Sequence, residues 1–141
     1  MAIALVRGFF FALACDWRIM RTGFGWMCLP EVNLGMRLQV GFAELVKAKL
    51  PPALLRESVL LATRYTSQAA LAKGLIDAEC PVEELMARAL AMAEERLQET
   101  LKLDQFDPKA LKQIKTELYT DAHEALSRGQ PIGFPSASAR L

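Results

Sequence analysis

At 141 residues the chain has the length of one domain, and its hydrophobic fraction of 52% is sufficient to form a core. Lys and Arg number 17 against 16 Asp and Glu, which gives a formal net charge of +1, and no block of like charge occurs along the chain. This balance excludes the basic stripe of a nucleic-acid-binding protein and the polybasic face of a membrane-surface protein. We therefore expect a globular domain without a nucleic-acid partner.

The first fifteen residues, MAIALVRGFFFALAC, form the most hydrophobic segment. A cleaved signal peptide or a membrane anchor is one interpretation. Against it, Arg7 and Gly8 interrupt the apolar run, no basic residue precedes it, and it is shorter than the roughly 20 residues that span a bilayer. The favoured interpretation is a buried strand over AIALV, a turn at Arg7 and Gly8, and a helix through FFFALACD. No membrane span is expected.

The next part of the chain predicts a strand, a turn and three helices. DWRIMRTG is expected to form a strand closed by Gly23, and PEVNLG a turn. In QVGFAELVKAKLPPALLRESVLLATRYT, Pro51 and Pro52 separate two helices, since proline ends one helix and is tolerated in the first turn of the next. Thr66 or Ser67 is expected to cap a short helix that ends at Gly74. LIDAECP then predicts an extended piece.

Two amphipathic helices are predicted beyond Pro81. The first carries apolar residues at i, i+3, i+4 and i+7 spacing, which indicates a core face or a subunit interface: Val82, Leu85, Met86, Ala89, Leu90, Ala93, Leu97 and Leu101. The second begins at Asp107 and Pro108 and ends near Gly129, with five residues expected inward: Leu111, Ile114, Leu118, Ala122 and Ala125. The tail GQPIGFPSASARL is too rich in proline, glycine and serine to form a regular element.

The cysteines and the single histidine do not predict a metal site. Cys15, Cys28 and Cys80 are far apart, lie among apolar neighbours and share no short spacing with His123. They are interpreted as reduced core residues of an intracellular protein rather than as disulfide or metal ligands. His123 is expected at a helix surface. Three acidic residues are expected to serve turns rather than catalysis: Asp16, Asp77 and Glu79.

Three sequence blocks occur in the order GFFFALACDWRIM, GWMCLPEVNLGM and ESVLLATRYTSQAALAKGLIDAECPVEEL. Together they resemble the enoyl-CoA hydratase/isomerase superfamily, or crotonase fold. The resemblance extends from Met1 to about residue 100, corresponds to roughly the second half of the family's sequence, and is strongest to the peroxisomal Δ3,Δ2-enoyl-CoA isomerases. It implies an α/β fold. Residues 1–80 would form the C-terminal part of the ββα spiral core, 81–128 a helical trimerisation region, and 129–141 a flexible tail.

The resemblance implies that Glu31, in LPEVNLG, is the family's catalytic glutamate. One carboxylate can take a proton beside the thioester carbonyl and return it two carbons away. Apolar neighbours would partly desolvate it and raise its pKa, namely Met27, Cys28, Leu29, Val32 and Leu34. Leu29 and Pro30 are expected to bind substrate, with Pro30 directing the carboxylate into the acyl pocket. From the residues alone, an exposed turn residue or a helix-end cap is the alternative interpretation of Glu31.

The resemblance also separates isomerase from hydratase. Hydratases usually carry a further glutamate early in the helix, where an ungapped count places Phe10, and an apolar ring cannot activate water. The family holds the enolate oxygen with two backbone N–H groups, one of them at the start of this helix. The same count places that donor at Arg7, followed by Gly8, although the family usually has glycine or alanine at the Arg7 position. The other donor comes from a loop of the F-S-x-G-x-D-L type, which does not occur in this chain and would precede Met1. A hydratase and a truncated, non-catalytic oligomer partner therefore remain alternatives.

The C-terminal tripeptide predicts a cellular location. Ala139, Arg140 and Leu141 have the small-basic-leucine form of a relaxed Ser-Lys-Leu peroxisomal signal. We therefore expect peroxisomal import through the import receptor. The family resemblance implies an acyl-CoA substrate of fatty-acid β-oxidation and a homotrimer or homohexamer. No cofactor is expected, since coenzyme A is part of the substrate.

Overall fold

The structure, a computed structural model, describes residues 2–100 and 107–128. It divides into two compact units, each assembled from segments that are distant in sequence. Unit 1 combines the chain up to Asp16 with Trp26–Tyr65 and the chain from Tyr119 onward. Unit 2 combines Trp17–Gly25 with Thr66–Leu118. Both units therefore depend on long-range contacts.

Unit 1 is helical. The strand expected over AIALV is wrong, because a single helix, α1, extends over Ala2–Ala14. A strand needs a neighbouring strand to pair its backbone groups, whereas a helix pairs them internally. Among the residues described for unit 1, extended pairing is limited to an isolated bridge between Met27 and Tyr65. The apolar character of this segment was predicted correctly, but its secondary structure was not.

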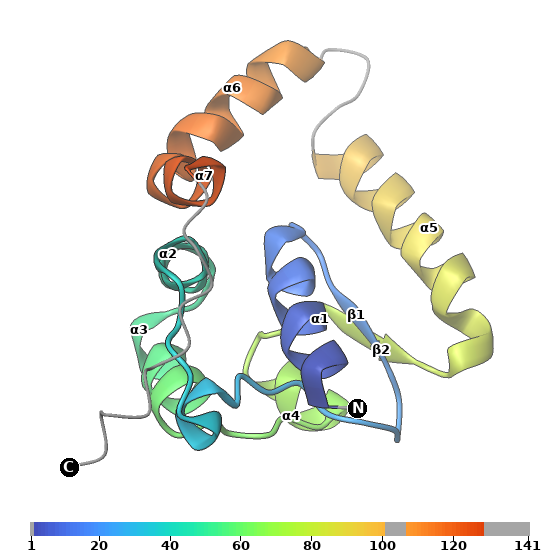
Figure 1. Cartoon of the computed structure of the whole chain (residues 1–141). Coiled ribbons are helices and arrows are strands. Elements are labelled where there is room, and N and C mark those ends of the chain that lie inside the picture. Colours follow the sequence, from blue (N-terminus) through green and yellow to red (C-terminus); the bar gives the residue numbers. More distant parts are fainter. Residues whose placement is uncertain (1, 101–106, 129–141) are drawn as a thin grey trace. The chain divides into compact units, whose positions relative to one another are not determined.

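The proline pair divides the following helices as predicted. Helix α2 (Val40–Lys49) ends before Pro51, and α3 (Pro52–Leu55) begins with proline at its first position, where the missing N–H is not needed. A π-helical turn, η2 (Arg56–Leu60), follows α3 directly. In unit 1, α2 packs against α1 and against the last helix, α7 (Thr120–Ser127) (Figure 1).

Unit 2 contains a two-stranded parallel sheet. Strand β1 (Ile19–Arg21) pairs with β2 (Ala78–Cys80), in the register Ile19 to Ala78 and Arg21 to Cys80 (Figure 1). Both strands lie in segments that were expected to be extended. The short helix α4 (Ser67–Ala72) precedes β2 and is capped as predicted, since the Oγ1 of Thr66 accepts a hydrogen bond from the amide of Ala69 at 3.3 Å.

The helical region after Pro81 is more segmented than the sequence predicts. A 3₁₀ turn, η3 (Val82–Glu84), leads into α5 (Leu85–Glu95) and a π-helical turn, η4 (Arg96–Thr100). The expected last helix is two helices, α6 (Pro108–Leu118) and α7, with Tyr119 between them in a non-helical conformation.

Burial corrects part of the predicted apolar stripes. On α6, Ile114 and Leu118 were expected inward but are 58% and 67% exposed, whereas Ala122 on α7 is buried. Along η3 and α5, four stripe residues are exposed: Val82, Met86, Ala89 and Leu90. The buried residue of α5 is Met92, which lies outside the predicted stripe. The exposed residues therefore do not contribute to a core within this chain.

The buried apolar residues fall into a larger group in unit 1 and a smaller one in unit 2. Unit 1 contributes Phe9, Phe10, Leu13, Cys28, Leu29, Leu45, Val46, Leu50, Leu54, Ala62, Tyr65 and Ala122. Unit 2 contributes Ala70, Leu75, Ile76, Cys80 and Met92. The segment that contains Glu31 therefore belongs to the better-packed unit.

Candidate active site around Glu31

Glu31 begins a 3₁₀ turn, η1 (Glu31–Leu34), between a proline and a glycine. Pro30 precedes the turn, and its carbonyl accepts hydrogen bonds from two amides within it. Gly35 ends the turn with a φ of 61°, a left-handed conformation that glycine adopts without strain. The amide of Met36 donates to the carbonyl of Glu31 at 2.9 Å. The backbone that carries the carboxylate is thus fixed on both sides.

The Glu31 side chain is buried, with 7% of its surface exposed. Within the described part of the chain, its Oε2 atom has no hydrogen-bond partner. Burial raises the pKa of the carboxyl, and a backbone hydrogen bond opposes this shift to a smaller extent. Such a group is a stronger base when ionised and a usable acid once protonated. The sheltered carboxylate is confirmed, and the alternative of an exposed turn residue is wrong.

The residues that shelter Glu31 differ in part from those expected. Cys28 and Leu29, before it, are 5% and 1% exposed. Val32 and Leu34, after it, are each 51% exposed. Desolvation therefore does not come from these two side chains. Leu29 lies in the core and Pro30 is half-buried, and their contact with an acyl chain stays a prediction.

The strand-like segment before Glu31 is tied to residues that follow η2. Met27 and Tyr65 exchange two backbone hydrogen bonds, each 2.9 Å long. The thiol of Cys28 donates to the carbonyl oxygen of Ala62 at 3.2 Å. Sequence reasoning missed these ties, because no local pattern links residues 27–28 with residues 62–65. A buried tyrosine after an apolar helix was the one visible signal.

The expected oxyanion donors lie inside α1. The helix begins at Ala2, so Arg7 and Gly8 are beyond its first turn, where backbone N–H groups bond to carbonyls of the preceding turn. The structure therefore does not place these two amides at a helix N-terminus, as the sequence interpretation required. This difference has the same cause as the absent strand, since a continuous helix replaces the strand, turn and helix start.

Phe10, which an ungapped count compares with the second glutamate of hydratases, is a core residue. It is 4% exposed and stacks on Phe42 of α2, with ring centroids 4.2 Å apart and ring planes inclined by 16°. The Phe10 ring therefore helps to join α1 to α2.

Four other residues were considered in the sequence, namely Asp16, Asp77, Glu79 and His123. Asp77 accepts a hydrogen bond from the Arg18 amide at 2.7 Å, and Asp16 lies 3.4 Å from the ammonium of Lys49. Glu79 lies in β2, with one buried oxygen that has no partner among the described residues. His123 is exposed, as expected.

None of the three cysteines forms a disulfide bond. Cys28 and Cys80 are buried as predicted, but Cys15 is exposed at the end of α1, contrary to the expectation of a core residue. Over residues 2–100 and 107–128, no group of three or more His, Cys, Asp or Glu side chains is arranged to hold a metal ion.

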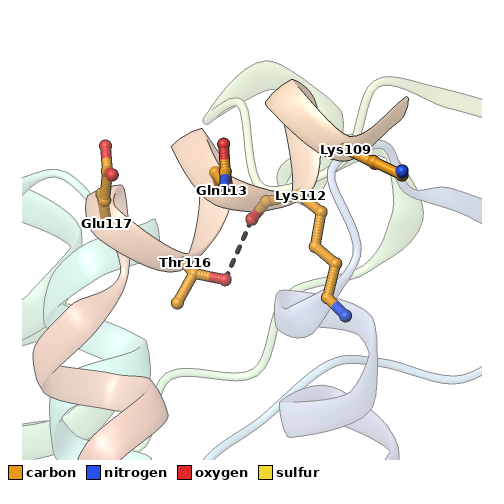
Figure 2. A pocket seen from close by; sticks show the side chains of 5 residues that line it. All are labelled: Lys109, Lys112, Gln113, Thr116 and Glu117. Carbon is orange, nitrogen blue, oxygen red and sulfur yellow. Dashed lines mark hydrogen bonds between the residues drawn. The ribbon is translucent and has the colours of Figure 1, made fainter. Parts of the chain in front are cut away.

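A pocket on α6 carries no comparable chemistry. Figure 2 shows its lining residues, which all belong to this one helix: Lys109, Lys112, Gln113, Thr116 and Glu117. The Thr116 hydroxyl donates to the carbonyl of Lys112 at 2.9 Å, a bond within the helix. The side chains lie along one helix surface, so we do not assign a ligand site to it.

Two further sequence predictions concern location. The tripeptide Ala139, Arg140 and Leu141 lies outside the described residues. Of the helices that the structure describes, none has both the length and the apolar character needed to cross a bilayer.

Comparisons with known proteins identify the fold. No curated protein sequence matches the chain. Among solved structures, an enoyl-CoA hydratase/isomerase family protein from Pseudomonas syringae is 28% identical, with a TM-score of 0.69, over 87% of this chain and 52% of its own. An enoyl-CoA hydratase from Mycobacterium ulcerans and an enoyl-CoA isomerase from Mycobacterium tuberculosis each give 24% identity and a TM-score of 0.68. Both cover 86% of this chain and 50% of their own, so the chain spans about half the length of these proteins.

The observed α/β arrangement is therefore a partial crotonase fold. The family model for enoyl-CoA hydratase/isomerase matches residues 3–131, most of the sequence. This chain belongs to the enoyl-CoA hydratase/isomerase family.

Proposed function

We propose that the chain contributes the catalytic base of a Δ3,Δ2-enoyl-CoA isomerase. The observation that carries the proposal is the buried carboxylate of Glu31 with an unpartnered oxygen. In the reaction, this carboxylate takes a proton from C2 of a 3-enoyl thioester, and the C3–C4 double bond shifts to C2–C3. The protonated Glu31 then returns the proton to C4. One group with a raised pKa serves both transfers.

An isomerase is supported over a hydratase by the position of Phe10. Addition of water needs a group that holds and activates the water. Phe10 is buried against Phe42, so neither a carboxylate nor space for one is present there. Proton transfer within the substrate needs no water.

A non-catalytic family member that acts as an oligomer partner is the second candidate. It is favoured by the continuous helix α1, which leaves the amides of Arg7 and Gly8 without the terminal position that an oxyanion donor requires. Loss of one such donor costs about 10²- to 10³-fold in rate.

The experiment that separates the two candidates is an assay of the purified chain with 3-enoyl-CoA, in which formation of 2-enoyl-CoA is followed. We expect conversion by the wild type, and a loss on the order of 10²- to 10⁴-fold in Glu31→Gln, because the amide cannot accept the proton. Glu83→Gln, at an exposed position in η3, is the matched control and should retain full activity. An inactive wild type would favour the oligomer partner, and an active Glu31→Gln would refute the base. Hydration of 2-enoyl-CoA in the same assay would support a hydratase instead.

Location and assembly are part of the proposal. We propose that the protein acts on acyl-CoA of fatty-acid β-oxidation in the peroxisome, as a homotrimer or homohexamer, without a further cofactor. A fluorescent protein fused to the N-terminus leaves the C-terminal tripeptide free for the import receptor. Punctate peroxisomal fluorescence should be lost when Leu141 is deleted. Import that persists without Leu141 would contradict the role of the tripeptide.

A further inference from the structure

The four residues Ala62–Tyr65, here called the support segment, contact the chain immediately before Glu31. The backbone pair Met27 and Tyr65 is joined by two hydrogen bonds of 2.9 Å. One residue further along, the Cys28 thiol donates to the Ala62 carbonyl at 3.2 Å. The hydrogen bond between Cys28 and Ala62 involves a side chain, so a mutation can remove it without altering the backbone hydrogen bonds.

The support segment is itself held from the other side. Tyr65 is 1% exposed, and its hydroxyl lies 3.1 Å from the Ser58 hydroxyl in η2, which is fully buried. The amide of Thr63 donates to the carbonyl of Glu57 at 3.1 Å. Ala62 has a φ of 47°, which is uncommon for a residue other than glycine and persists only where the surroundings impose it. The Ala62 carbonyl is therefore a fixed acceptor.

We propose that Cys28 is a positioning residue for Glu31, and that its hydrogen bond to Ala62 keeps the carboxylate in its buried orientation. The inference deepens the proposed function, on which it rests. Only Leu29 and Pro30 lie between the two residues. Leu29 is packed in the core and Pro30 has a restricted φ, so displacement of Cys28 moves the start of η1. A shift of about 1 Å in a catalytic group can cost on the order of 10²-fold in rate.

The charges around Cys28 are consistent with a neutral thiol that donates. Burial raises the pKa of the Cys28 thiol most, the nearby guanidinium charge of Arg64 lowers it, the Glu31 carboxylate raises it, and a side-chain hydrogen bond with Arg64 lowers it, so that the pKa is raised overall. The thiol therefore keeps its proton in the neutral range and can donate it to the Ala62 carbonyl. A thiolate could not make this bond.

The test compares three variants of the full chain. Cys28→Ala removes the donor, and Cys28→Ser replaces it with a hydroxyl that can bond to the same carbonyl. Cys80→Ala is the matched control, because Cys80 is also buried, at 7% exposure, but lies in β2 of unit 2. The first readout is the titration of the Glu31 carboxyl by NMR of ¹³C-labelled glutamate, with the signal assigned by its loss in Glu31→Gln. The second readout is the isomerase rate.

We expect Cys28→Ala to move the Glu31 titration midpoint down towards that of an ordinary glutamate, and to lower kcat about 10-fold or more. Cys28→Ser should restore both, and Cys80→Ala should change neither. Equal titration in wild type and Cys28→Ala would overturn the inference, as would a Cys28→Ser variant that behaves like Cys28→Ala. The titration needs no activity. A chain without isomerase activity whose Glu31 midpoint still responds to Cys28→Ala would therefore contradict the proposed function but support the positioning role.

Discussion

Phe10 and Phe42 form a stacked pair that joins α1 to α2, at the position where hydratases of the resembled family usually place a second glutamate. Both functional and structural consequences follow from this contact. The ring at position 10 supplies part of the core that fixes α1, and under the proposed function it also stands in place of a second carboxylate.

Replacement of Phe10 by alanine should destabilise unit 1 strongly. The ring is 4% exposed, and truncation of a buried phenylalanine costs about 3–5 kcal/mol, because a cavity remains. Phe11→Ala is the matched control, since the neighbouring ring is 76% exposed and its removal should change stability by about 0.5 kcal/mol or less. Unfolding in urea, followed by fluorescence of Trp26 in unit 1, measures both values. Equal effects of the two substitutions would contradict the stacked pair.

Replacement of Glu31 by glutamine should stabilise the chain at neutral and alkaline pH. Burial raises the native-state pKa of Glu31 above the ordinary value of 4.5, so the native state binds more protons than the unfolded state between these two values. Stability from this group is therefore present in full below pH 4.5 and is lost as pH rises through the native-state pKa. Glutamine cannot ionise and escapes this loss.

The measurement is the unfolding free energy of the wild type and Glu31→Gln at about pH 4 and about pH 8, the limits between which the linkage effect should develop. The stability advantage of the variant should be larger at the higher pH. Exposed Glu83, replaced by glutamine, should show no such pH-dependent difference. A constant difference across the range would show that the carboxylate is not desolvated.

Two glycine-to-alanine substitutions should have opposite signs. A Cβ at Gly41 would lie 2.7 Å from the Cδ2 of Leu126 and 3.0 Å from its backbone nitrogen, so α7 must move away from α2. We expect Gly41→Ala to cost about 1–3 kcal/mol. At Gly8, within α1, no atom lies within 4 Å of the added Cβ, and Gly8→Ala should stabilise the helix by about 0.5–1 kcal/mol. Thermal unfolding of both variants tests the packing of α2 on α7.

The exposed apolar residues of η3 and α5 should matter for assembly rather than for folding. Val82, Met86 and Leu90 are 46%, 73% and 60% exposed and are spaced four residues apart, so Met86 and Leu90 lie on one face of α5. The double variant Met86→Gln, Leu90→Gln should leave the unfolding midpoint nearly unchanged and lower the mass found by size-exclusion chromatography with light scattering. An unchanged mass would exclude this face from the proposed oligomer interface.

Local chemistry predicted the parts of the fold that are decided within a few residues. Pro51 and Pro52 separate α2 from α3, and Thr66 caps α4, because a missing N–H and a side-chain acceptor act on their immediate neighbours. These features need no knowledge of distant segments. The sheltered carboxylate of Glu31, by contrast, was expected from the family resemblance, because the residues alone left an exposed turn residue or a helix-end cap as the alternative.

Features that depend on distant partners were predicted less well. AIALV has strand composition but forms helix, since strand formation depends on a neighbour in the sheet. A 3.6-residue period shows that one face of a helix is apolar, but it does not show which segment packs against that face. The break at Tyr119 and the exposure of Ile114 could therefore not be predicted from it. In the site, the bond between Cys28 and Ala62 joins residues 34 positions apart, and its acceptor depends on the positive φ of Ala62.

The parallel pairing of β1 with β2 sets an order of events on the ribosome. Arg18 is bonded to Asp77, 59 residues later, so β1 leaves the exit tunnel well before the segment that completes its sheet. At about 5–20 residues per second, this interval lasts roughly 3–12 s. During that time β1 is exposed without the strand that pairs with it, and holdase chaperones should engage nascent chains that end before residue 80.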